Sequence, residues 1–95
     1  MIALKIYVVE NSNSSTKAIQ DLETLLKERF SGQYFLKVID VLSEPKLAEV
    51  DRILATPTVV KTFPEPERRI VGSLGDHEKV LAGLGLANNL RDKKE

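Results

Sequence analysis

Residues 55–72 read ATPTVVKTFPEPERRIVG, and this stretch decides the fold. Pro57 cannot continue a helix, and residues 58–63 are rich in β-branched side chains, so a strand is expected to begin there. The turn PEPE at residues 64–67 fixes the backbone at two prolines, and an extended pattern resumes at residues 68–71. The stretch therefore predicts a β-hairpin with a stiff tip, entered through a proline.

A βαβ unit is expected ahead of this hairpin. Residues 3–9 alternate between the two faces of a strand in the way that a half-buried strand does. The polar run that follows offers caps for a helix beginning near Ser14 or Ser15, and an apolar stripe extends from there to Phe30. Residues 34–42 are the second strand. Its nearly continuous apolar run predicts burial on both faces, as in an interior strand of a parallel sheet.

A short helix is expected between the second strand and the hairpin. Ser43 is a candidate cap, and Pro45 suits the first helical turn because its missing N–H would be unpaired there anyway. The buried side of this helix is expected to comprise Leu47, Val50 and either Ile53 or Leu54. The helix should end at the Ala-Thr-Pro that opens the hairpin stretch.

A last helix is expected after the hairpin, capped by Asp76 or Gly75. One face of it holds His77, Val80, Leu81, Leu84 and Ala87. Gly83 and Gly85 weaken it by roughly 2 kcal/mol together relative to alanine, so residues 80–86 suit a helix face or a short strand about equally.

Composition limits the function classes open to this chain. With 95 residues, 42% of them hydrophobic, it should form one domain over residues 1–90 with a frayed tail at 91–95. Fourteen Lys and Arg balance fourteen Asp and Glu, which argues against a nucleic-acid partner. There is no cysteine, so disulfides, thiolate metal sites and dithiol redox chemistry are excluded. One histidine does not make a metal site, and no cofactor is expected.

No membrane partner is expected either. The longest apolar stretches run only a handful of residues, far short of the length that spans a bilayer. Met1 leads directly into a strand-like segment without a basic region or a cleavage site. We therefore expect a soluble, cytoplasmic protein.

The expected order βαβαββα, with a proline just before the third strand, resembles the thioredoxin architecture. In thioredoxin-like oxidoreductases the active dithiol lies between the first strand and the first helix, where the helix N-terminus lowers a thiol pKa. Residues 10–15 of this chain hold Glu-Asn-Ser-Asn-Ser-Ser at that place and no sulfur. Disulfide exchange is therefore chemically impossible here, and fold alone does not give a function.

The residues carry a more specific resemblance than the order of elements does. The sequence resembles the KaiB family of cyanobacterial circadian clock proteins. The resemblance covers roughly residues 4 to 86. Its motifs are LKIYVVEN at 4–11, LKVIDVL at 36–42, Pro45, LAE at 47–49, Asp51, ILATPT at 53–58, Lys61, Pro64, Pro66, RRI at 68–70, Gly72 and EKVL at 78–81.

The resemblance implies a regulator that is not an enzyme. Members of this family bind the N-terminal ATPase ring of KaiC, help to sequester KaiA, and compete with or signal through the histidine kinases SasA and CikA. The family is also metamorphic: its binding-competent state is a thioredoxin-like monomer, and its ground state, often a tetramer, has the order βαββααβ. Two packings of one chain that differ by a few kcal/mol satisfy the energetic requirement for such a switch. The prolines at 57, 64 and 66 and the glycines at 83 and 85 lie in the half that changes.

The chain departs from the family pattern near its C-terminus. The family's Gly-Leu-Asp is Gly83-Leu84-Gly85 here, an expected aromatic residue is Asn88, and the acidic tail is replaced by RDKKE at 91–95. These positions are where the ground-state tetramer would be stabilised. We therefore expect the thioredoxin-like monomer to dominate, with Pro57 in cis at the start of the third strand.

Five basic residues are candidates for partner binding. The resemblance implies that Lys37 and Arg52 engage KaiC, and Lys61, Lys17 and Arg69 are weaker candidates; the alternative for each is a solvated surface charge. Arg68 and Arg69 should point to opposite faces of their strand, one of them covered by packing or paired with Glu65 or Glu67. Asp40 and Asp51 are expected to have structural or surface roles, since paired catalytic carboxylates must converge in a pocket.

A second class of function stays open on the residues alone. A small thioredoxin-like ligand binder, in the manner of glutathione transferases, would use Ser12, Ser14 and Ser15 at the start of the first helix to hold an anion or a glutathione-like ligand. Helix capping is the simpler role for these hydroxyls. No thiol-activating partner or second domain supports the transferase hypothesis.

Overall fold

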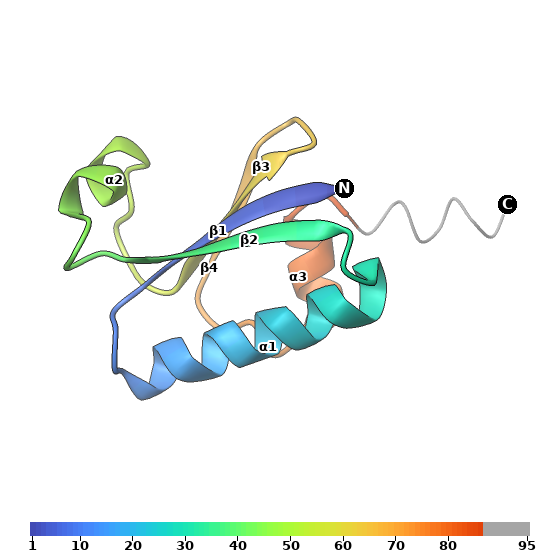
Figure 1. The fold of residues 1–95 in the computed structure, drawn as a ribbon, viewed down its shortest axis with the longest axis horizontal. Helices are drawn as coiled ribbons and strands as arrows, with labels where there is room; N and C mark the ends of the chain where they lie inside the picture. The colour runs from blue at the N-terminus through green and yellow to red at the C-terminus, as the bar shows by residue number, and fades with distance from the viewer. Residues whose placement is uncertain (87–95) are drawn as a thin grey trace, which may run out of the picture.

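A four-stranded mixed sheet with three helices forms the fold of residues 1–86, the part of the chain that the computed structural model describes (Figure 1). The strands are β1 (Ile2–Val8), β2 (Tyr34–Asp40), β3 (Thr58–Phe63) and β4 (Arg68–Val71). The helices are α1 (Asn13–Phe30), α2 (Pro45–Val50) and α3 (His77–Gly83). This is the predicted thioredoxin-like order βαβαββα, and the alternative order βαββααβ is not adopted. The predictions for Ala87, Asn88 and the tail at 91–95 lie outside the described residues.

The sheet order is β2-β1-β3-β4. β1 pairs with β2 in parallel, and β3 is antiparallel to both β1 and β4. The peptide bonds before Pro57, Pro64 and Pro66 are all cis, as predicted for Pro57. Pro57 is buried at the entrance to β3, and the hairpin that decides the fold is present with the predicted bounds.

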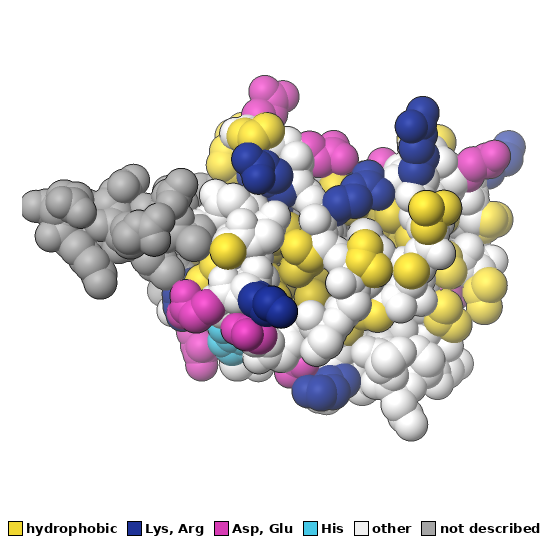
Figure 2. All heavy atoms as spheres, turned by 180° about the vertical axis from the view of Figure 1, so that it is seen from behind, with side chains coloured by type: hydrophobic (Ala, Val, Ile, Leu, Met, Phe, Trp, Pro, Cys, Tyr) yellow, Lys and Arg dark blue, Asp and Glu magenta, His cyan; other side chains and the backbone are white. Residues whose placement is uncertain are grey.

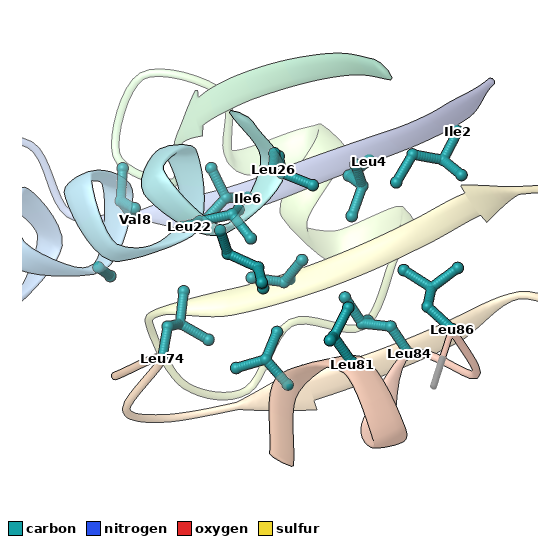
Figure 3. Close-up of a cluster of buried hydrophobic side chains, with 14 residues drawn as sticks. Ile2, Leu4, Ile6, Val8, Leu22, Leu26, Leu74, Leu81, Leu84 and Leu86 are labelled. Atoms are coloured by element: carbon teal, nitrogen blue, oxygen red, sulfur yellow. The ribbon is translucent and has the colours of Figure 1, made fainter. Parts of the chain in front are cut away.

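The main core lies between one face of the sheet and the helices α1 and α3. Leu22 and Leu26 of α1 pack against β1, whose apolar positions alternate toward this face as the sequence pattern predicts (Figure 3). Leu81 and Leu84 close the cluster from the side of α3. A buried aliphatic side chain contributes roughly 1.5–3 kcal/mol to folding, so this cluster is the main source of stability.

Helix α1 begins at Asn13, one residue before the expected start near Ser14 or Ser15, because Ser12 is its cap. The Ser12 hydroxyl accepts a 3.1 Å hydrogen bond from the Ser15 backbone N–H. The Ser15 hydroxyl is buried and accepts a 3.0 Å bond from the N–H of Val9, which ties the helix start to the end of β1. Ser31, with φ 48°, ends the helix in the left-handed conformation just ahead of the predicted Gly32.

The two glycines near the C-terminus have structural roles that differ from the expected weakening of the helix. A Cβ on Gly83 would clash with the side chain of Ile70, so glycine lets α3 lie directly against β4. Gly85 has φ 74° and follows the helix as its left-handed cap. The Leu86 N–H then bonds the Leu81 carbonyl at 2.8 Å, which completes a Schellman motif and satisfies an end carbonyl of α3.

Two predictions of burial are wrong. β2 is an edge strand rather than an interior one, and Phe35 and Val38 remain 58% and 47% exposed. α2 has no buried residue, because it stands beyond the end of the sheet instead of packing across it (Figure 1). Ser43 does not cap it either, since its hydroxyl donates to the Asp40 carboxylate at 2.8 Å.

Candidate protein-binding surface

The most exposed apolar residues of the described chain gather around α2. We call the following set the α2 surface: Leu42, Leu47, Val50, Arg52 and Leu54. Leu54 is 97% exposed and Val50 77%. Burial was predicted for Val50 and for either Ile53 or Leu54, and of these only Ile53 is partly buried. A group of apolar side chains left in water by a folded domain is typical of a protein-binding surface when its members lie together.

The chain leaves α2 through a turn that fixes the place of Arg52. Arg52 has φ 56°, and the N–H of Ile53 bonds the Ala48 carbonyl at 2.9 Å. This is a Schellman motif with arginine at the left-handed position, where glycine is usual. Ile53 turns back to pack with Ala48 against a second cluster, formed by Tyr7, Ile39 and Val60, on the other face of the sheet. The exposed Arg52 is thereby held at the rim of the α2 surface.

A partly buried polar cluster anchors the end of α2 to the sheet. The carboxylate of Asp51 accepts a 2.6 Å bond from Lys5 Nζ, and it also accepts a short bond from the Tyr7 hydroxyl. Arg69 Nη1 donates to the Asp51 carbonyl at 2.7 Å, and Arg69 also lies 3.6 Å from Glu67, one of its two expected partners. β1, β4 and α2 are therefore joined at one residue.

Partial burial and hydrogen bonding shift the pKa values of Tyr7 and Asp51 in this cluster. Burial, together with the hydrogen bond to the Asp51 carboxylate, raises the pKa of the Tyr7 hydroxyl well above its usual value. Burial alone would raise the pKa of the Asp51 carboxyl, but the hydrogen bonds from Lys5 and Tyr7 outweigh it and hold that pKa below its usual value. Asp51 is thus ionised at neutral pH and accepts from two donors, which makes it a structural carboxylate.

The connection from β2 into α2 is held by a second carboxylate. Asp40 accepts hydrogen bonds from the backbone N–H groups of Glu10 and Leu42 and from the Ser43 hydroxyl. The bond from Ser43 is the main cause that lowers the pKa of Asp40. Asp40 and Asp51 are therefore engaged separately, at opposite ends of α2, and do not form a catalytic pair.

The structure separates the five candidate basic residues. Lys37 is exposed, and it lies on β2, the strand at one edge of the sheet that leads into the α2 surface. Lys37 and Arg52 therefore lie at the two ends of residues 37–52, which run from β2 through α2. Lys17 lies on α1, 3.1 Å from Asp21. Arg69 is tied to Asp51.

Lys61 does not present its charge to solvent. It is 2% exposed, and its ammonium donates to the carbonyls of Pro64 and Pro66 at 2.6 and 2.9 Å. Burial, with a contribution from the Arg68 charge, lowers the pKa of Lys61. In this fold Lys61 holds the tip of the hairpin, so its expected role in direct partner binding is not supported.

Sequence reasoning missed the Lys5, Tyr7 and Asp51 cluster and the exposure of α2. Lys5 and Tyr7 could be placed on the face opposite Leu4 and Ile6 by alternation. Their meeting with Asp51 depends on where α2 docks, and no local pattern gives that. Among residues 1–86, no group of three or more His, Asp or Glu side chains could hold a metal, and no helix could span a membrane.

Comparisons with known proteins agree with this geometry. The family model described as KaiB domain matches residues 5–86. The circadian clock oscillator protein KaiB of Gloeothece citriformis is 55% identical over 83 residues, which cover 87% of this chain and 78% of that protein. KaiB of Synechococcus elongatus is also 55% identical, over 87% of this chain and 81% of that protein.

Solved structures with a similar fold include clock and thioredoxin proteins. The N-terminal domain of SasA from Synechococcus elongatus superposes with a TM-score of 0.68 at 25% identity, over 96% of this chain and 80% of that chain. Chloroplastic thioredoxin z superposes with a TM-score of 0.73 at 21% identity, over 94% of this chain and 80% of that chain, and this likeness shows the fold alone.

Proposed function

The chain belongs to the KaiB family, and from that membership we propose that it is a cytoplasmic, non-enzymatic clock regulator that binds the N-terminal ATPase ring of KaiC. In the KaiC-bound state it helps to sequester KaiA and competes with kinases of the SasA and CikA type. The observation that carries the proposal is the α2 surface, an exposed apolar patch with Arg52 at its rim.

The α2 surface and the β2 edge together suit protein binding. Leu54, Val50 and Leu42 offer apolar area that becomes favourable once a partner removes it from water. Arg52 and Lys37 supply positive charge at the two ends of this stretch, which favours partner carboxylates and speeds association. The open edge of β2 adds unpaired backbone groups for a partner strand.

Competition with SasA is supported by the shared fold. The N-terminal domain of SasA has the same architecture, so both proteins can present equivalent elements to one site. A second candidate function, the glutathione-transferase-like ligand binder, is not favoured, since the Ser12 and Ser15 hydroxyls are already used by the helix start.

The test is binding of KaiC from Synechococcus elongatus by the variants Arg52→Gly and Lys46→Ala. Arg52→Gly removes the charge at a left-handed position where glycine is unstrained, so the fold should be at least as stable as in the wild type. We expect affinity for KaiC to fall about tenfold, as for the loss of one well-placed interfacial charge. Lys46→Ala removes an exposed lysine from α2, the helix just before Arg52, and should leave the affinity within about twofold.

The opposite result is equally clear. If Arg52→Gly binds KaiC as tightly as the wild type, or if the SasA N-terminal domain does not displace the chain, the proposed site is wrong. A wild-type chain that fails to bind KaiC at all would overturn the proposed function itself.

A further inference from the structure

The second open edge of the sheet lies on the side of the molecule away from β2. β4 is the terminal strand in the order β2-β1-β3-β4, so one row of its backbone groups has no partner strand within residues 1–86. The Gly72 N–H bonds the Pro57 carbonyl at 2.9 Å and therefore points inward, toward β3. Because successive backbone N–H groups of a strand point to opposite sides, those of Arg69 and Val71 face the open edge.

A pocket adjoins this edge. It has a volume of about 340 Å³ and lies between β4 and α3, lined by Ile70, Val71, Ser73, Lys79 and Val80. Val71 is 60% exposed beside it. Figure 2 shows this side of the molecule, where the cyan histidine at the start of α3 lies among magenta Asp and Glu side chains, and hydrophobic and dark blue Lys and Arg side chains lie beyond it.

The charge around the pocket indicates which kind of segment fits. Lys79 is exposed, and no carboxylate within residues 1–86 forms an ion pair with it. Arg68, on the same strand, is exposed as well. Asp76 accepts a hydrogen bond from the Lys79 backbone N–H at 3.2 Å, but the Lys79 ammonium forms no ion pair within the described residues and is available to an acidic side chain at the rim of the pocket.

The size of the β4 edge favours a short peptide segment over a second copy of the chain as its partner. A stable protein dimer buries on the order of 1,200 to 2,000 Å² in all, whereas the edge offered here is one strand of four residues with a single pocket. Such an edge suits strand addition by a short extended segment, in which backbone bonds supply affinity and alternate side chains supply specificity.

We propose that the β4 edge is a docking site for an extended, acidic segment of a partner protein, which adds a strand beside β4. An apolar side chain of the segment enters the pocket between β4 and α3. A carboxylate two residues away, on the same face of the added strand, pairs with Lys79. This site is separate from the α2 surface and the β2 edge, and its existence does not depend on KaiC binding.

The experiment is an NMR titration of the full chain with a blocked pentapeptide of sequence TVTET. We expect resonances of β4, Ser73, Lys79 and Val80 to shift, with a Kd on the order of 1 mM for so small a contact. The matched peptide TVTKT should bind about two- to fivefold more weakly, the size of effect expected from one exposed ion pair. Lys79→Glu should reverse the order of the two peptides.

A backbone variant tests strand addition itself. Val71→Pro removes an N–H that faces the open edge and not β3, whereas Val71→Thr changes the same pocket-lining side chain and keeps that N–H. The hairpin should be retained in both variants, and TVTET binding should be lost only in Val71→Pro. Lys37→Glu on the opposite edge is the control and should bind TVTET as the wild type does. Shifts confined to β2, no shifts at millimolar peptide, or equal binding of TVTET and TVTKT would overturn the proposal.

Discussion

Asp51, at the end of α2, accepts a 2.6 Å hydrogen bond from the Nζ of Lys5, which lies 46 residues earlier in β1. The contact is partly buried, with 17% of the Asp51 side chain and 29% of the Lys5 side chain exposed. It joins the central strand to a helix that buries none of its own residues. The place of α2, and with it the α2 surface, therefore depends on this carboxylate as well as on the packing of Ala48 and Ile53 against the second cluster.

Replacing that carboxylate should loosen α2. Asp51→Asn retains the shape but loses the charge-assisted bonds, and we expect the free energy of unfolding to fall by about 1–2 kcal/mol at pH 7. Urea denaturation measures the change. Glu49→Gln, exposed on the same helix, is the matched control and should stay within about 0.5 kcal/mol of the wild type.

The pH dependence of the same variant follows from the lowered pKa of Asp51. A carboxyl whose folded pKa lies below its unfolded value of about 3.9 adds stability that is fully present above that value. This stability is lost as the pH falls through the folded pKa. The difference between the wild type and Asp51→Asn should therefore be constant from pH 5 to 7 and shrink below about pH 4. An unchanged difference at pH 3 would contradict the assignment.

Lys61→Met should release the hairpin tip. The substitution removes the donor that bonds the carbonyls of Pro64 and Pro66, and two acceptors then lose their partner. Relief from burying a charge offsets part of the cost, so we expect a loss of about 1–3 kcal/mol, seen by urea denaturation, with shifted amide resonances at Glu65 and Glu67. Lys27→Met, on the exposed side of α1, should change stability by less than about 0.5 kcal/mol. A Lys61→Met protein as stable as the wild type, with unshifted tip resonances, would show that the hydrogen bonds from Lys61 to Pro64 and Pro66 do not stabilise the hairpin tip.

Gly83 and Ile70 should be strongly coupled. Gly83→Ala improves helix propensity by up to about 1 kcal/mol, but its new methyl group collides with Ile70. Overpacking of this kind costs about 1–3 kcal/mol, so the single variant should be less stable than the wild type. In an Ile70→Ala background the collision is gone, and the same change should become neutral or stabilising. A double-mutant cycle with no coupling would refute the close approach of α3 to β4.

These contacts show where sequence reasoning succeeds. Alternation in β1 and the apolar stripe of α1 are local patterns, and both elements appear within one or two residues of their expected bounds. The hairpin at 58–71 is equally local, since proline and the β-branched runs specify it directly. The Ser12 cap was ambiguous because several hydroxyls precede α1, and any of them could have accepted the first free N–H.

The rest depends on the arrangement of elements in space. An apolar strand such as β2 is suited to the interior of a sheet, and only the strand order shows that it is an edge. Val50 and Leu54 have the spacing of a buried helix face, but α2 lies beyond the sheet and leaves them in water. Lys61 is a charged residue of the kind expected on a surface, but the turn of its own hairpin buries it. The candidate site therefore differs from its prediction in β2 and α2, where the docking of elements decides exposure, and at Lys61, where a local turn buries the ammonium.

The thioredoxin-like state should be a monomer. Residues 80–86, which include the divergent Gly83-Leu84-Gly85, have their apolar side chains committed to the core of one chain, since Val80, Leu81, Leu84 and Leu86 are each at most 3% exposed. Little apolar surface of this segment is therefore left for a contact between subunits. Sedimentation velocity from micromolar to millimolar concentration should give one species of monomer mass, and NMR secondary shifts should show strands at 58–63 and 68–71 and a helix from His77. A tetramer at micromolar concentration, or helical shifts through the hairpin, would mean that the alternative order βαββααβ prevails in solution.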